Sequence, residues 1–134
     1  MTTAFWAAAT TAWFVLMTWL SHQSGPQTSR NSRRLAEELH TLLPSADAGS
    51  LDAVLRKAAH VAVFAVLTVL LGTTLAAGRK NDLRPLAAGA LLVWCWGDEA
   101  TKRMVPGRHF SWLDVCLNMA GVLLGGAGVL LTLP

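Results

Sequence analysis

The sequence predicts an all-α protein: a four-transmembrane-helix bundle with a short interfacial amphipathic helix between the first two spans. Of its 134 residues, 53% are hydrophobic and only 14% are charged, and the mean hydropathy is +0.43. This composition is too apolar for an ordinary soluble domain of this size. Four apolar segments are long enough, or nearly so, to cross about 30 Å of hydrocarbon as helices: 4–20, 58–77, 85–97 and 113–133. These segments occupy most of the chain, so we expect a single domain over residues 1–134.

The first apolar segment could be read as a secretory signal, because it is N-terminal and rich in alanine. However, no basic residue precedes it, and its only Ala-x-Ala stretch, at 7–9, lies too early to be a cleavage site. We therefore interpret it as a retained membrane anchor.

A polar connection over residues 21–51 separates the first two spans. Gly25 and Pro26 should end the first helix, and Asn31 can then cap a short helix that ends at Pro44. Its leucines recur at helical spacing, with charged residues on the other side. The leucines are Leu35, Leu39, Leu42 and Leu43, and the charged residues are Arg33, Arg34, Glu37 and Glu38. We expect an interfacial amphipathic helix; the alternative is a solvated turn packed on its own protein.

The second helix should begin before the hydrocarbon. Asp52, Arg56 and His60 stand at successive i,i+4 positions and therefore share one helical face. Lys57 neighbours His60 at i,i+3.

The third span should begin at Pro85, a favourable first-turn residue. From Pro85 to Gly97 there are only about 13 residues, or roughly 20 Å of helix, so a full crossing must continue through Asp98 and Glu99 toward Met104. The acidic pair is therefore expected below the membrane surface.

The fourth span has an explicit start. Ser111 can act as N-cap with Asp114 three residues later, which is a capping box with aspartate in place of the usual glutamate. Asn118, Gly121 and Gly125 continue close to the same helical face, and the two glycines form a small-xxx-small surface that lets another helix approach closely. Asp114 and Asn118 should then point into the bundle. The glycine surface can pair within the bundle or between chains, as a homo-oligomer.

Four spans place the 21–51 connection and the 105–110 turn at one side, with both termini and the basic loop 79–84 at the other. The charged start of the second span, the charged end of the third and the capped start of the fourth then converge. Ionisable groups in spans are costly unless they face one another, a ligand or a water-filled cavity. We therefore expect one membrane face to carry the chemistry.

The polar residues that converge there form a recognisable pattern. It comprises Ser21, Gln23, Arg56, Lys57, His60, Asp98, Glu99, Pro106, Gly107, Arg108, Ser111, Asp114, Asn118 and Gly121. With this spacing the chain resembles the VanZ-like family of small bacterial integral membrane proteins over nearly its whole length. It departs from the family pattern at Lys102, where glutamine is usual, and at Phe64, where tyrosine is frequent. The resemblance implies a multi-pass protein of the bacterial cell (inner) membrane, and the family's name member is linked to resistance to the lipoglycopeptide antibiotic teicoplanin.

The candidate catalytic residues are His60, Asp98 and Glu99. Histidine can take up and release a proton near neutral pH, and either carboxylate could orient it. Two structural alternatives stand beside this hypothesis. His60 can be a satisfied interior residue, and the acids can be neutralised at i,i+4 by Lys102 and Arg103.

The candidate ligand-binding residues are Gln23, Lys57, Arg108, Ser111, Asp114 and Asn118. Arg108 follows a Pro-Gly turn and offers a planar fork for phosphate or carboxylate, or alternatively an anchor on lipid headgroups. We expect membrane lipids and an amphipathic anionic envelope molecule or a lipoglycopeptide as partners. Three roles are open for the site. It could catalyse a reaction, it could only bind its ligand, or it could be a structural polar cluster that stabilises the bundle or supports a partner protein.

Other ligand classes are not expected. No HExxH or similar ligand spacing occurs, so we expect no metal and no other cofactor. The net charge of +3 suits anionic lipid headgroups better than nucleic acid, because the chain has no separate basic domain.

The distribution of basic residues bears on orientation. On the side of the polar residues lie Arg30, Arg33, Arg34, Arg56, Lys57, Lys102, Arg103 and Arg108, and on the other side lie Arg79, Lys80 and Arg84. The positive-inside rule would make the polar side cytoplasmic. The family resemblance implies a cytoplasmic N-terminus and an outward-facing site, and we follow it in expecting an extracytoplasmic site.

Overall fold

The computed structural model describes residues 2–42 and 48–133, and this part of the chain is helical without β-strands. The elements are α1 (Thr3–Ser21), α2 (Gly25–Leu42), α3 (Ala48–Ala77), η1 (Asn81–Leu83), α4 (Arg84–Thr101), η2 (Lys102–Met104) and α5 (Trp112–Thr132), where η marks a 3₁₀ turn. The predicted all-α class is confirmed.

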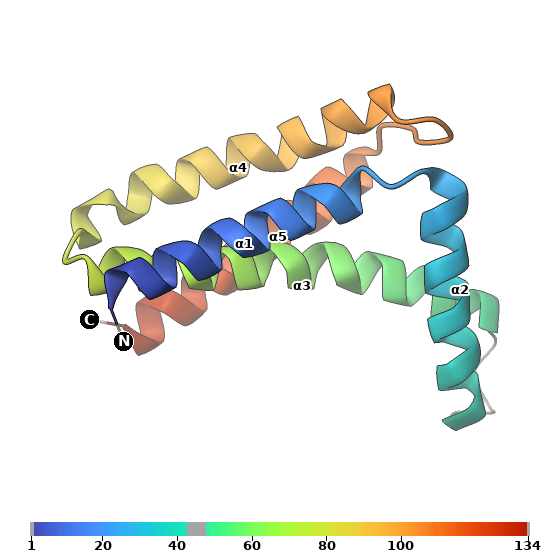
Figure 1. The fold of residues 1–134 in the computed structure, drawn as a ribbon, viewed down its shortest axis with the longest axis horizontal. Helices are drawn as coiled ribbons and strands as arrows, with labels where there is room; N and C mark the ends of the chain where they lie inside the picture. The colour runs from blue at the N-terminus through green and yellow to red at the C-terminus, as the bar shows by residue number, and fades with distance from the viewer. Residues whose placement is uncertain (1, 43–47, 134) are drawn as a thin grey trace.

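The helices of the bundle run lengthwise, and α2 crosses them at one end (Figure 1). α1, α3, α4 and α5 follow the long axis, while α2 stands nearly perpendicular to it. Both termini and the α3–α4 turn lie at one end of the bundle; the α1–α2 connection and the α4–α5 turn lie at the other. The predicted convergence of the polar segments at one end is therefore confirmed.

Among residues 2–42 and 48–133, three helices are long and apolar enough to cross a membrane: α1, α5 and the part of α3 from Ser50 to Ala77. The predicted third span, α4, is not one of these three, so the four-span arrangement stays a prediction. The distribution of side chains agrees with a membrane protein. Leu86, Val93 and Leu131 are at least 71% exposed, whereas Asp98 and Asn118 are at most 2% exposed. A soluble protein normally has the opposite arrangement, with large apolar groups inside and charges outside.

α5 packs on α3 through its small residues. A Cβ atom on Gly121 would collide with the carbonyl oxygen of Val61, and one on Gly125 would lie 2.5 Å from the carbonyl oxygen of Ala65. Only glycine permits this close approach of the two backbones. The glycine surface thus packs inside one chain here, and its pairing between chains stays a prediction.

The helix between the first two spans begins earlier than predicted. Gly25 and Pro26 do end α1, but they also form the first turn of α2, where proline is well tolerated. Asn31 therefore does not cap the helix; its Nδ2 donates to Gln23 Oε1 at 3.4 Å. The predicted helix end at Pro44, together with Leu43, lies outside the described residues.

The starts of α3 and α5 agree with the prediction. α3 was expected to begin before its apolar run, and it begins at Ala48, whereas the run starts at Ala58. α4 continues through Asp98 and Glu99 into η2, as predicted.

Candidate functional site

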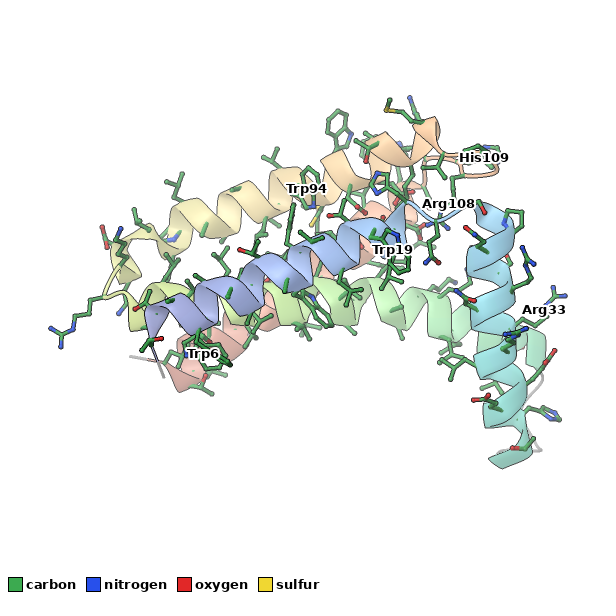
Figure 2. All side chains as sticks on the ribbon, viewed as in Figure 1. Trp6, Trp19, Arg33, Trp94, Arg108 and His109 are labelled. Atoms are coloured by element: carbon green, nitrogen blue, oxygen red, sulfur yellow. The ribbon has the colours of Figure 1, made fainter. Side chains whose placement is uncertain are left out.

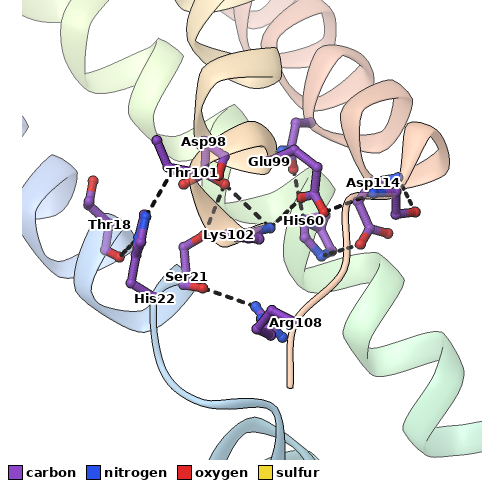
Figure 3. Close-up of polar contacts among 12 residues, drawn as sticks. Thr18, Ser21, His22, His60, Asp98, Glu99, Thr101, Lys102, Arg108 and Asp114 are labelled. Carbon is purple, nitrogen blue, oxygen red and sulfur yellow. Dashed lines mark hydrogen bonds and ion pairs between the residues drawn. The ribbon is translucent and has the colours of Figure 1, made fainter. Parts of the chain in front are cut away.

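Polar side chains from α1, α3, α4, η2, α5 and the 105–111 turn meet in one network of hydrogen bonds and ion pairs (Figure 3). The position of Arg108 places this network at the end of the bundle that bears α2 (Figure 2). We call this group the polar cluster. It consists of Ser21, His60, Asp98, Glu99, Lys102, Arg108, Ser111, Asp114 and Asn118.

The innermost part of the polar cluster is a buried ion triad. Lys102 Nζ lies 2.5 Å from Glu99 Oε2 and 3.4 Å from Asp98 Oδ2, and all three residues are at most 2% exposed. Buried charges are costly to desolvate and need such partners. The expected Asp98–Lys102 pair is present, but Lys102 serves both carboxylates.

The expected ion pair between Glu99 and Arg103 is wrong. The helix tightens to a 3₁₀ turn at Lys102, and this geometry brings residues three apart into register, as Glu99 and Lys102 are. Arg103 turns outward, and its guanidinium carbon lies 4.9 Å from the centre of the Phe110 ring.

Glu99 also joins α4 to the start of α5. Ser111 caps α5 as predicted, because its Oγ accepts a hydrogen bond from the Asp114 N–H at 3.3 Å. In a complete capping box the Asp114 carboxylate would accept from the Ser111 N–H. Instead Glu99 Oε1 accepts that hydrogen bond, at 3.2 Å. The Asp114 carboxylate is thereby left to face His60.

His60 is held between two side chains of α5. Its Nδ1 lies 2.9 Å from Asn118 Oδ1, and its Nε2 lies 3.6 Å from Asp114 Oδ2. Because the amide oxygen accepts, Nδ1 carries the proton of the neutral ring, and Nε2 is free to accept another beside the Asp114 carboxylate. The His60 and Asp114 side chains are 23% and 30% exposed, so a ligand can reach this pair.

The expectation that Asp98 or Glu99 orients His60 is therefore corrected. Those carboxylates bind Lys102, and the partners of His60 come from α5. The close packing of α3 on α5 through Gly121 explains the difference, because it turns the His60 face of α3 toward α5.

The end of α1 is fastened to the same cluster. Ser21 Oγ donates to Asp98 Oδ2 at 2.9 Å, and Arg108 Nη2 donates to the Ser21 carbonyl at 3.0 Å. His22 Nε2 lies 2.9 Å from Thr101 Oγ1 and adds a second link to α4. These contacts connect α1, α4 and the α4–α5 turn.

A cavity of about 500 Å³ opens beside the polar cluster. It is lined by Pro26, Ser29, Arg56, Glu99, Lys102, Gly107, Arg108, His109 and Asp114. Two arginines and one lysine thus line it, together with two carboxylates. The size falls within the range typical of ligand pockets.

Arg108 lacks a carboxylate partner: among the described residues none lies within 4.0 Å of its guanidinium group. Its Nε is buried and has no hydrogen-bond partner in that part of the chain, and the same holds for Asp98 Oδ1 and Asn118 Nδ2. Buried polar atoms are normally paired, and a network left partly unpaired is a candidate functional site.

The predicted site residues divide into three groups. Glu99, Arg108 and Asp114 line the cavity, while Asp98, His60, Ser111 and Asn118 hold lining residues or one another in place. Gln23 binds Asn31 on α2, and Lys57 is exposed on α3; neither lines the cavity.

Sequence reasoning missed two cationic lining residues. Arg56, rather than its neighbour Lys57, lines the cavity, and its i,i+4 position before His60 was the available signal. Lys102 was interpreted only as a residue that neutralises the acidic pair, and its departure from the family pattern was the available signal. Within the described residues no three His, Cys, Asp or Glu side chains are grouped so that they could hold a metal ion.

A family model described as VanZ/LLP1 matches residues 6–133, which is nearly the whole chain. No curated protein and no solved structure matches significantly.

Proposed function

Because the chain belongs to the VanZ/LLP1 family, we propose that it is a multi-pass protein of the bacterial inner membrane that binds an amphipathic anionic molecule in its polar cavity. The ligand is an envelope molecule with a phosphate or carboxylate, or a lipoglycopeptide antibiotic of the teicoplanin type. Binding would lower the free concentration of such an antibiotic.

The proposed membrane arrangement has four spans, with α4 as the third to cross. α4 contains 18 residues, and it exposes Leu86 and Val93 at 72% and 71%, which suits contact with lipid. Its acidic residues Asp98 and Glu99 are buried against Lys102 and do not face the hydrocarbon. α2, perpendicular to the bundle and charged on its exposed side, would lie along the membrane surface beside the cavity.

The observation that carries the proposed function is Arg108, which faces the cavity without a carboxylate partner. A guanidinium group can donate two parallel hydrogen bonds to a phosphate or a carboxylate. Arg56 lines the same cavity and adds a second positive charge. The apolar part of the ligand would extend into the lipid beside the bundle.

The test is a binding measurement with two probes, teicoplanin and a short-chain phosphatidic acid, on purified protein in neutral detergent. Arg108→Gln should weaken binding about 10- to 100-fold, because hydrogen bonds to a charged group contribute about 1.5–3 kcal/mol. Arg103→Gln is the matched control, since Arg103 is exposed and does not line the cavity. Equal affinity of both variants and the unaltered protein for both probes would contradict the proposal.

Acid–base chemistry at His60 is a second candidate function. It is favoured by the free Nε2 beside Asp114 and by the hydrogen bond from Nδ1 to Asn118, which fixes the ring. In this case envelope lipids or glycans should differ between cells with and without the protein, as measured by mass spectrometry, and His60→Gln should abolish that difference while binding persists. An unchanged profile together with saturable binding would favour capture over catalysis.

A further inference from the structure

A second cavity lies between α3, α4 and α5, toward the opposite end of the bundle from the polar cluster. Its volume is about 200 Å³. Leu71 and Leu75 line it from α3, Ala88 and Leu91 from α4, and Val129 from α5. Among these apolar groups it holds one charged side chain, that of Arg84 at the start of α4.

Arg84 lacks partners for its guanidinium group. Its Nε and Nη2 atoms are buried and have no hydrogen-bond partner among residues 2–42 and 48–133. No carboxylate of these residues lies within 4.0 Å of it. Arg84 as a whole is partly buried, and these two nitrogens lack both a partner and contact with solvent. Buried polar atoms without a partner are costly, so an anionic group that accepts hydrogen bonds from them would be favoured.

We propose that this cavity binds part of one acyl chain of an anionic phospholipid, with the headgroup phosphate accepting hydrogen bonds from Arg84. The site is separate from the polar cavity, and it rests on the four-span arrangement proposed above, in which α4 lies in the bilayer. The lipid belongs to the leaflet opposite the polar cluster.

The shape of the cavity suits a chain that lies along the helices. On α4 it extends from Arg84 to Leu91, which is about 10 Å at 1.5 Å per residue. On α3 it extends from Thr68 to Leu75, a similar length. A volume of about 200 Å³ is too small for a whole lipid, so only part of one chain fits.

The position of Arg84 suits a headgroup. It follows the exposed polar residues Lys80, Asn81 and Asp82, which place the start of α4 at the membrane–water boundary. Basic pockets between transmembrane helices at this depth are known to hold anionic headgroups. The apolar cavity and the unpaired cation therefore meet where a phospholipid has its acyl chain and its phosphate.

The experiment is native mass spectrometry of the full chain, reconstituted with equal amounts of phosphatidylglycerol and phosphatidylethanolamine and then released from the membrane mimetic. The unaltered protein should retain phosphatidylglycerol preferentially. Arg84→Gln should lower that preference at least about fivefold, because a basic residue near the membrane surface contributes about 1 kcal/mol to anionic lipid binding.

Gly126→Leu tests the apolar part independently. Gly126 lines the cavity, and a Cβ there would meet nothing within 4 Å, so leucine can fill the space without a backbone clash. This variant should lose the retained lipid although Arg84 is intact. Gly128→Leu is its matched control: it also has open space at its Cβ but does not line the cavity.

Further controls separate this site from others. Lys80→Gln removes an exposed charge at the same end and should keep the lipid. The loss caused by Arg84→Gln should be the same in a chain that also carries Arg108→Gln, because Arg108 lines the polar cavity and not this one. Equal retention of both lipids by the unaltered protein, or unchanged selectivity in Arg84→Gln, would overturn the proposal. Displacement of the bound lipid by glycerol phosphate alone would show an anion site without a bound acyl chain. A dimer that is detected for the unaltered protein but not for Gly126→Leu would show that a second copy of the chain occupies the cavity. Either result contradicts the lipid site and leaves the proposed function of the polar cavity standing.

Discussion

Lys102 holds the buried part of the polar cluster together, because it is the ammonium group shared by Asp98 and Glu99. Lys102→Met would leave two buried carboxylates without a cation. Removal of one partner from a buried ion pair costs about 3–5 kcal/mol, so the free energy of unfolding in mixed detergent should fall by about that amount.

The double variant Lys102→Met, Glu99→Gln checks this explanation. It removes one of the two uncompensated charges, so part of the lost stability should return. If the double variant is less stable than Lys102→Met alone, the triad is not the cause of the loss.

Ser111 and Asp114 have different roles that substitution can separate. Ser111→Ala removes the N-cap of α5 and should lower the free energy of unfolding by about 1 kcal/mol. Asp114→Asn keeps the backbone N–H that Ser111 caps and should change stability by less than about 1 kcal/mol, because its carboxylate and His60 are partly exposed. Only Asp114→Asn should impair ligand binding or turnover, measured with the same probes.

A loss of binding in Ser111→Ala at full stability would contradict this division of roles. It would mean that the hydroxyl group contacts the ligand in addition to capping the helix.

At the level of helices, the approach of α5 to α3 positions His60 against Asn118. Gly121→Ala would push the Cβ into the backbone of Val61 and should lower stability by about 1–3 kcal/mol, as overpacking usually does. Because His60 lies one residue before Val61, the same change should also impair any function that depends on the His60–Asn118 contact. The measurements are unfolding in detergent and ligand binding.

Gly128→Ala is the control for this prediction. It lies on the same helix with open space at its Cβ, and it should be neutral or slightly stabilising because alanine favours helix. Equal effects of both substitutions would show that helix propensity, rather than close packing, determines the result.

The sequence predicted most of the elements because their signals are local. The apolar runs, the Ser111 cap and the Gly25–Pro26 break each depend on a few neighbouring residues, and the structure agrees with all three. The start of α2 was misplaced because Gly25 and Pro26 can both end one helix and begin the next. Asn31 was then assigned a cap that the helix did not need.

The partners within the polar cluster were harder to predict because they depend on how helices rotate against one another. Sequence spacing placed Asp98, Glu99, Asp114 and His60 at one end of the bundle but did not determine which acid faces His60. That choice has two causes. Glu99 accepts the hydrogen bond of the Ser111 N–H, and Glu99 pairs with Lys102 where a pair with Arg103 was expected. Both are contacts between elements or at a 3₁₀ turn, where regular helical spacing no longer applies.

At the scale of the whole molecule, the proposed function needs four spans and an outward-facing cavity, and labelling of single cysteines in intact cells tests both. Cys95 and Cys116 are free thiols and would first be replaced by alanine. Single cysteines would then be placed at the exposed positions Gln27, Asn81 and Met104. A membrane-impermeant maleimide should label Gln27→Cys and Met104→Cys in intact cells, and Asn81→Cys only after permeabilisation.

Each position tests a different part of the arrangement. Gln27, in α2, precedes α3 in the chain and Asn81 follows it, and α3 is long and apolar enough to span, so the two positions should report opposite sides. Met104 follows α4, so labelling together with Gln27 requires that α4 crosses in spite of its charges, whereas labelling together with Asn81 would exclude the fourth span. If only Asn81→Cys is labelled in intact cells, the polar cavity faces the cytoplasm. The excess of basic residues at the polar end of the bundle favours this orientation. An extracellular antibiotic could then no longer be the ligand of the cavity.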